Sequence, residues 1–209
     1  MFVAFEGIDG VGKSTQIERL ANLYPNAIVT KEPGGTKFGE ILRSIILSEN
    51  FKFNGDNHIN LGQICPKISK TAEMFLFLAD RAEHYDKVIA PNRDKLILSD
   101  RSFVSGIAYA LANDKEANFT ELVTLNRQVL CGDFDGKFIF FEISKDDLIA
   151  RLKERGNADN IELRGIDYLL LVQEKIKLTL QTLKLEFLCV NANDDIDKIT
   201  KSIKEFIDD

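Results

Sequence analysis

Cysteine is scarce in this chain of 209 residues. The three cysteines, Cys65, Cys131 and Cys189, are odd in number, lie far apart and form no C-x-x-C pair. This spacing argues against a disulfide framework and against a cysteine-based zinc site, and it is typical of proteins in reducing compartments. We therefore expect a cytoplasmic protein.

Long hydrophobic runs and an excess of positive charge are also missing. The longest apolar runs, such as residues 138–141, are far below the roughly 18 residues that a membrane span needs. Residues 1–5 are apolar but reach Glu6 without a basic segment, so no signal peptide is expected. Twenty-seven Lys and Arg face 33 Asp and Glu, and the net charge of -6 argues against nucleic acid or an anionic membrane as a partner.

Linkers, repeats and clustered prolines are absent as well, while 44% of the residues are hydrophobic. One domain over residues 1–209 is therefore expected. Continuous β-branched or aromatic runs predict strands buried on both faces at residues 2–5, 27–30, 96–99, 138–143 and 187–190. Stretches with helical spacing lie between them, and Asn193 is the expected N-cap of the last helix. The alternation predicts an α/β fold with a parallel sheet and helices on both faces.

Two segments do not fit this alternation. Residues 50–69 contain Gly, Asn, Asp and Pro with little periodicity, and an irregular insertion is expected there. Residues 156–165 are short, rich in Asn and Asp, and flanked by Arg151, Arg155 and Arg164. A mobile active-site lid is expected for this second segment.

The clearest motif follows the first predicted strand. Residues 7–14 match G-x-x-x-x-G-K-[ST], the P-loop, in which backbone N–H groups converge on phosphates. Lys13 is expected to bind the β and γ phosphates, and Ser14 to bind Mg²⁺. A regulatory GTPase would also need N-K-x-D, which the sequence lacks. The residues expected to bind ATP are Gly7, Ile8, Asp9, Gly10, Val11, Gly12, Lys13, Ser14 and Thr15.

Further motifs follow in order: E-P-G-G-T at 32–36, L-R-S at 42–44, F-L-A-D-R at 77–81 and S-D-R-S at 99–102. Together with F-E-G before the P-loop, they give a chain that resembles the thymidylate kinase family over essentially its whole length. The resemblance implies the P-loop NTPase fold with a five-stranded parallel sheet. It also implies transfer of the γ-phosphoryl group of ATP to dTMP with Mg²⁺, and a homodimer.

Asp100 and Arg101 also have a direct physical interpretation. Asp100 ends a predicted strand at its carboxyl edge, where a carboxylate can hold Mg²⁺ through water or can cap a helix. Arg101 can clamp a phosphate with parallel hydrogen bonds or can lie on the surface. From spacing alone, Phe77 would more often be a core residue, and Arg43 and Arg81 would be surface charges.

The resemblance assigns roles to these and other residues. It implies that Phe77 stacks on thymine, Arg81 bonds the base and Tyr109 lies under the deoxyribose. It also implies that Arg43 holds the acceptor phosphate and Asp9 contacts the 3'-hydroxyl. The implied acceptor-site residues are Asp9, Arg43, Phe77, Arg81, Arg101, Ser105 and Tyr109.

The chain departs from the family pattern at Ser102, Ala110 and Asn160, where tyrosine, glutamine and arginine are usual, and in the long segment 50–69. No basic residue precedes Lys13 in the P-loop, so the resemblance implies that a lid arginine supplies the missing charge. Arg155 matches best, and the expected catalytic residues are Lys13, Arg101 and Arg155. The alternatives are another P-loop nucleotide or nucleoside kinase, and a nucleotide-binding switch without turnover.

Overall fold

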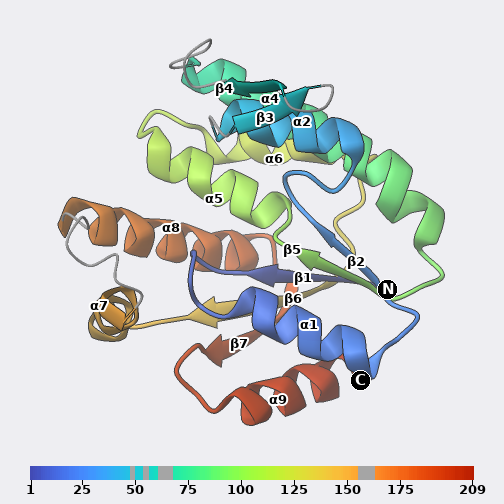
Figure 1. The fold of residues 1–209 in the computed structure, drawn as a ribbon, viewed down its shortest axis with the longest axis vertical. Coiled ribbons are helices and arrows are strands. Elements are labelled where there is room, and N and C mark those ends of the chain that lie inside the picture. Colours follow the sequence, from blue (N-terminus) through green and yellow to red (C-terminus); the bar gives the residue numbers. More distant parts are fainter. Residues whose placement is uncertain (48–49, 54–56, 61–67, 155–162) are drawn as a thin grey trace.

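The computed structural model describes residues 1–47, 50–53, 57–60, 68–154 and 163–209 (Figure 1). Its strands are β1 (Phe2–Glu6), β2 (Ile28–Lys31), β3 (Asn50–Phe53), β4 (Asn57–Asn60), β5 (Ile97–Asp100), β6 (Lys137–Glu142) and β7 (Glu186–Asn191). Its α-helices are α1 (Lys13–Leu23), α2 (Lys37–Ile46), α4 (Lys70–His84), α5 (Phe103–Asn113), α6 (Phe119–Val129), α7 (Lys145–Glu154), α8 (Leu163–Thr182) and α9 (Ile196–Asp208).

The main sheet has the strand order β2-β5-β1-β6-β7, and all its pairs are parallel. Every predicted strand is present within a residue or two of its expected bounds. Helices α1 and α9 lie on one side of the sheet and α5 and α8 on the other (Figure 1). The predicted α/β fold is therefore confirmed. In the register, Phe5 lies opposite Asp100, so the carboxyl ends of β1 and β5 meet at one edge of the sheet.

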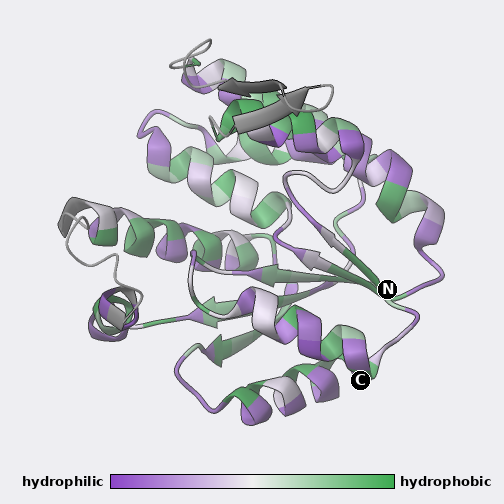
Figure 2. Ribbon diagram, in the orientation of Figure 1, coloured by the Kyte–Doolittle hydropathy of each residue, from purple (hydrophilic) through white to green (hydrophobic). Residues whose placement is uncertain are grey.

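The central strands form the core, because β1, β5 and β6 are almost entirely buried. Figure 2 shows hydrophobic residues along these strands and on the helix faces that cover them. Burial on both faces was expected for all five strands, and this is wrong for β2 and β7. Both are edge strands, and Val29 of β2 is 53% exposed. In the described part of the chain, no helix is long and apolar enough to cross a membrane.

The segment 50–69 is less irregular than expected. Strands β3 and β4 pair antiparallel, with Asn50 opposite Asn60 and Phe53 opposite Asn57, and form a separate two-stranded sheet. Residues 54–56 and 61–67 lie outside the described residues. Of the expected lid, residues 156–162 also lie outside the described part, and residues 163–165 begin helix α8.

Helix α9 begins two residues later than expected. Asp195, not Asn193, is its N-cap, and the Asp195 carboxylate accepts hydrogen bonds from the backbone N–H groups of Asp197 and Lys198. Both residue types are good N-caps, so composition alone does not choose between them. The side chain of Asn193 instead accepts a hydrogen bond from Arg151.

This correction gives a stability prediction. Asp195→Ala removes the acceptor of two N–H groups at the start of α9, and we expect it to lower the free energy of unfolding by about 1 kcal/mol. Asn193→Ala is the matched control, with an expected change below about half of that value. Urea denaturation of both variants measures the difference. A larger loss for Asn193→Ala would show that the helix is capped from the earlier position.

Candidate active site

The P-loop joins β1 to α1, as the sequence predicts. Gly12 has a φ of +99° directly before α1, a left-handed conformation that favours glycine. Gly7 packs against β6, and a Cβ atom there would lie 3.0 Å from the carbonyl oxygen of Phe141. These glycines allow the backbone to turn sharply at the carboxyl end of the buried strand. Ser14 and Thr15 are exposed in the first turn of α1.

Lys13 is buried inside the loop that precedes it. Its Nζ donates hydrogen bonds to the carbonyl oxygens of Gly7 (3.0 Å) and Ile8 (2.9 Å), and the residue is 6% exposed. Burial and the nearby Arg101 guanidinium lower the pKa of Lys13 to about 8. A buried ammonium whose partners, in the part of the chain described, are two neutral carbonyls is well prepared to bind an anion.

Arg101 reaches the same loop from the end of β5. Its Nη1 donates to the Gly7 carbonyl (2.8 Å) and its Nη2 to the Asp9 carboxylate (2.7 Å). Burial alone would raise the pKa of Asp9, but Arg101 and Lys13 outweigh it and hold that pKa below its ordinary value. The predicted residues Asp9, Lys13 and Arg101 therefore come together at one point.

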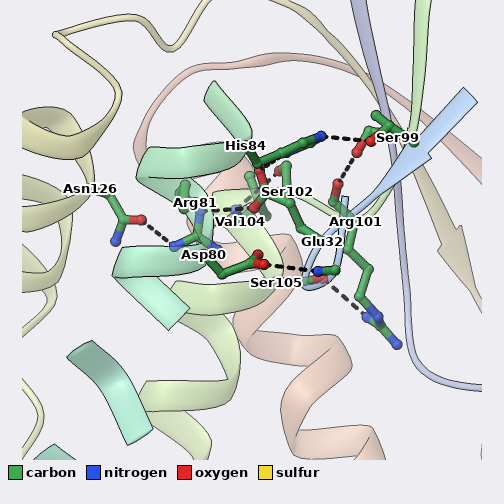
Figure 3. Close-up of polar contacts among 12 residues, drawn as sticks. Glu32, Asp80, Arg81, His84, Ser99, Arg101, Ser102, Val104, Ser105 and Asn126 are labelled. Atoms are coloured by element: carbon green, nitrogen blue, oxygen red, sulfur yellow. Dashed lines mark hydrogen bonds and ion pairs between the residues drawn. The ribbon is translucent and has the colours of Figure 1, made fainter. Parts of the chain in front are cut away.

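Arg101 has a backbone conformation that is unusual for a residue with a side chain. Its φ is +74°, in the left-handed region. The Arg101 N–H donates to the Phe5 carbonyl (3.0 Å), and the Arg101 carbonyl accepts from the Ser99 hydroxyl (2.8 Å; Figure 3). These bonds hold the strained residue in place, and such strain occurs most often at functional sites.

Glu6 is a fully buried carboxyl next to these cations. The hydroxyls of Ser102 (2.6 Å) and Ser105 donate to its two oxygens, and Ser105 also accepts a hydrogen bond from Arg101. Burial raises the pKa of Glu6 to about 7, against the opposing effect of the two serines and Arg101. Sequence reasoning assigned Glu6 no role, although a charged residue at the end of an apolar strand is a signal for one.

Asp100 has the one buried side-chain oxygen that lacks a hydrogen-bond partner among the residues described here. This Oδ1 atom lies at the carboxyl end of β5, and a buried carboxylate oxygen without a donor fits a cation or its bound water. Within the described ranges, no group of three or more His, Cys, Asp and Glu could hold a metal. The arrangement fits Mg²⁺, which keeps several waters and is bound by few protein ligands together with phosphates.

Arg43 and Tyr109 face the same region from α2 and α5. The Nη1 of Arg43 donates to the Pro33 carbonyl (3.1 Å), so the guanidinium lies against the 32–36 turn. Tyr109 is half-buried, and the Arg101 guanidinium lies over its ring, 5.4 Å from the centroid. Phe77 on α4 is half-buried and stands outside the main hydrophobic core. Its ring is therefore not the fully buried core residue that spacing alone favours.

Arg81 is buried and firmly held. Its Nε donates to Glu32 (2.9 Å) and its Nη1 to Asn126 (2.7 Å), and it is 3% exposed (Figure 3). Glu32 also contacts His84 Nδ1 (3.0 Å). Burial alone would raise the pKa of Glu32, but Arg81 and His84 lower it below its ordinary value. Arg81 is thus not a surface charge. The roles of its partners Glu32 and Asn126, and of His84 on the far side of Glu32, were missed by sequence reasoning.

Of the three lid arginines, Arg151 on α7 is placed in contact with the P-loop. Its Nη1 donates to the Gly10 carbonyl (3.2 Å), and its other nitrogens bond Ala192 and Asn193 in the connection before α9. Arg155 lies outside the described residues, and the side chain of Arg164 is likewise not described. Arg151 therefore connects α7 to the phosphate-binding loop.

Comparisons with known proteins agree with this geometry. The family profile described as thymidylate kinase matches residues 5–203. The chain is 52% identical to a thymidylate kinase of Campylobacter hominis, over 99% of this chain and 100% of that protein. It is also 51% identical to a thymidylate kinase of Campylobacter concisus, over 99% of this chain and 98% of that protein. The chain also has the same fold as the crystal structure of thymidylate kinase from Ehrlichia chaffeensis, with a TM-score of 0.68. The two sequences are 23% identical, and the match covers 100% of this chain and 98% of the Ehrlichia chain.

The buried Glu6 gives a prediction about stability and pH. Its pKa is about 7 in the folded protein and near 4.5 when unfolded, so the folded state keeps this proton longer. The free energy of unfolding should therefore fall as the pH rises through this range. Relative to Glu6→Gln, we expect the wild type to lose about 2 to 3 kcal/mol between pH 5 and pH 8.

Chemical denaturation at several pH values measures this loss. Glu205→Gln is the control, because Glu205 is an exposed carboxylate on α9. The control should follow the wild-type pH dependence, whereas Glu6→Gln should flatten it. A wild-type curve parallel to that of Glu6→Gln would show that Glu6 is ionised throughout.

Proposed function

The chain belongs to the thymidylate kinase family and is a nucleoside-monophosphate kinase, and we propose that its site transfers the γ-phosphoryl group of ATP to dTMP, giving dTDP and ADP. One observation carries the assignment of the chemistry to this site. Lys13 opens α1 after the P-loop that follows β1, Arg101 follows the neighbouring parallel strand β5, and both donate to the Gly7 carbonyl at the carboxyl edge of the sheet. Ligands of open α/β sheets bind at this edge.

The donor side is the P-loop. Lys13 exchanges its carbonyl partners for the β and γ phosphate oxygens of ATP, and the N–H groups at the start of α1 bind the remaining oxygens. Ser14 and, through water, Asp100 would hold Mg²⁺, which would offset the charge of these phosphates. The partnerless Oδ1 of Asp100 supports this assignment.

The acceptor side lies between α2, α4 and α5. Arg101 and Arg43 bind the dTMP phosphate, and Asp9 accepts a hydrogen bond from the sugar 3'-hydroxyl. Phe77 stacks on thymine, Arg81 donates to the base, and Tyr109 lies under the deoxyribose. Ser105 contributes by supporting Arg101, to whose Nη1 it lies within 3.1 Å. The cytoplasmic location and the homodimer expected from the sequence belong to the same proposal.

Catalysis consists of positioning and charge stabilisation. The acceptor phosphate is itself a nucleophile and the transition state is loose, so no general base is required. Lys13, Arg101 and Arg155 share the charge that develops on the transferred group. Arg101 is already fixed by the Gly7 carbonyl and the Asp9 carboxylate, and this lowers the cost of reorganisation during the reaction.

The first functional prediction concerns Lys13. Lys13→Ala removes the ammonium from the transferring phosphate and should lower kcat by about 100-fold or more without loss of fold. Lys201→Ala, an exposed lysine on α9, is the matched control with unchanged turnover. ADP release is measured with dTMP, dUMP, UMP, dCMP and thymidine, and dTMP should be the preferred acceptor.

Two results would contradict this assignment. A Lys13→Ala variant that retains a tenth or so of wild-type turnover would separate the P-loop from the chemistry. If the wild-type enzyme prefers another acceptor over dTMP, dTMP is not its substrate. If ADP is released at the same rate without any acceptor, the enzyme hydrolyses ATP and the proposed kinase reaction is wrong.

The second functional prediction separates the lid arginines. Arg155→Ala should lower kcat by about 100-fold with little change in the KM for dTMP, because this arginine acts mainly on the transition state. Arg151→Ala and Arg164→Ala are the matched comparisons, and Arg151→Ala should also loosen the contact with Gly10. Steady-state kinetics with the concentrations of ATP and dTMP varied in turn give kcat, the KM for ATP and the KM for dTMP of each variant. An unchanged kcat for Arg155→Ala with a raised KM for ATP would move the catalytic role to Arg151 or Arg164.

A further inference from the structure

We propose that Asn126 is a positioning residue that fixes the Arg81 guanidinium and thereby strengthens the discrimination between thymine and cytosine. Asn126 belongs to α6, a helix to which neither motifs nor family resemblance assigned a role in the site. The inference rests on the proposed contact between Arg81 and the base of the acceptor nucleotide. Figure 3 shows the Asn126 side chain directed at Arg81.

Arg81 is held at two points of its planar group. Glu32 accepts from Nε at 2.9 Å and Asn126 accepts from Nη1 at 2.7 Å, and all three residues are at most 5% exposed. A guanidinium carries its N–H donors in a rigid fork. A bond at Nε alone leaves the side chain free to adjust, whereas a second bond at Nη1 fixes the direction of the remaining donors.

Gly106 of α5 borders Arg81 Nη2, for which the described part of the chain supplies no hydrogen-bond acceptor. A Cβ atom on Gly106 would lie 2.6 Å from Arg81 Nη2, which is closer than such contacts occur. The space that Nη2 occupies therefore exists because residue 106 has no side chain. Between them, Glu32, Asn126 and Gly106 define the position of the whole guanidinium.

The amide of Asn126 is itself oriented. Its Nδ2 donates to the Leu122 carbonyl of the preceding helical turn at 2.7 Å, so Oδ1 must face Arg81. Arginine has no acceptor, and this agrees with the same orientation. The amide is neutral, so it directs the guanidinium without adding a second carboxylate next to Glu32. Arg81 thus keeps charge for a further acceptor.

A fixed orientation matters because discrimination requires rejection as well as attraction. The O4 atom of thymine accepts a hydrogen bond, whereas the amino group of cytosine at the same place donates one. A rigid arginine meets that amino group with its own donors, which leaves buried donors unpaired and is costly. An arginine that can rotate away tolerates cytosine better. Loss of the Asn126 side chain should therefore weaken the discrimination between thymine and cytosine while the protein still folds.

The test measures the dissociation constants of dTMP and dCMP by calorimetry, together with kcat and KM for dTMP. Arg81→Ala should reduce the ratio of the two dissociation constants by about tenfold or more, as expected for loss of a charged hydrogen bond. Asn126→Ala should reduce it by about three- to tenfold and raise the KM for dTMP more than it lowers kcat. Asn126→Asp keeps an acceptor for Arg81 Nη1 but adds a second carboxylate and loses the donor to Leu122, so it should reduce the ratio less than Asn126→Ala does.

Asn118→Ala is the matched control. Asn118 caps α6 through the N–H groups of Thr120 and Glu121, so its loss should destabilise the same helix and leave the ratio unchanged. Gly106→Ala is the second variant, because alanine suits the helix but its Cβ displaces Arg81 Nη2. It should reduce the ratio even if Asn126→Ala proves too unstable to purify.

The outcomes distinguish this inference from the proposed function. If Arg81→Ala reduces the ratio but Asn126→Ala and Gly106→Ala leave it unchanged, Asn126 is merely structural and the inference is overturned. An unchanged ratio in Arg81→Ala would remove the proposed base contact, and the inference with it. The acceptor preference of the wild type, measured separately, would still test the function.

Discussion

The carbonyl oxygen of Gly7 accepts hydrogen bonds from both cations of the site, Lys13 at 3.0 Å and Arg101 at 2.8 Å. This shared acceptor holds two positive groups together in a place that excludes most water. Burial, and after it repulsion from Arg101, lower the pKa of Lys13 to about 8, and the carboxylates of Asp100 and Asp9 oppose that shift. The fold thus holds a buried ammonium and a guanidinium side by side at the carboxyl edge of the sheet, where a phosphate can bind both.

Most of the fold was predictable because its signals are local. Continuous apolar runs mark the five parallel strands, and the P-loop motif marks the first turn between strand and helix. The edge strands were harder, because a short apolar run such as residues 27–30 looks the same at the edge as in the centre. Val29 is half-exposed because the strand order places β2 at the edge of the sheet, and the sequence does not reveal that order. The short strands β3 and β4 were missed because their pairing joins residues four to ten positions apart and does not depend on hydrophobic content.

The site was predictable to the extent that it is written in contiguous motifs. The P-loop with Asp9, and Arg101 after its strand, come together as expected. The residues that hold these groups were not predictable, because they act across the chain. Glu6 meets Ser102 and Ser105 nearly a hundred positions later, and Asn126 meets Arg81 from another helix. One signal was available in the sequence: His84 follows Arg81 by three positions on the same helix, a spacing that puts both side chains on one face, where they can share a partner such as Glu32.

Two buried glutamates support the two ends of the acceptor site, and they differ in charge for a physical reason. Glu32 is bonded directly to Arg81 and His84, so its pKa stays below the ordinary value despite complete burial. Among the described residues, Glu6 is bonded to the hydroxyls of Ser102 and Ser105 and to no cation, and burial raises its pKa to about 7. The end proposed to bind the base is therefore held by a permanent ion pair, whereas the end proposed to bind phosphate rests on a carboxyl that can be neutral. A fixed charge suits recognition of a neutral base. A carboxyl without its negative charge avoids repelling the phosphates that Arg101 and Lys13 attract.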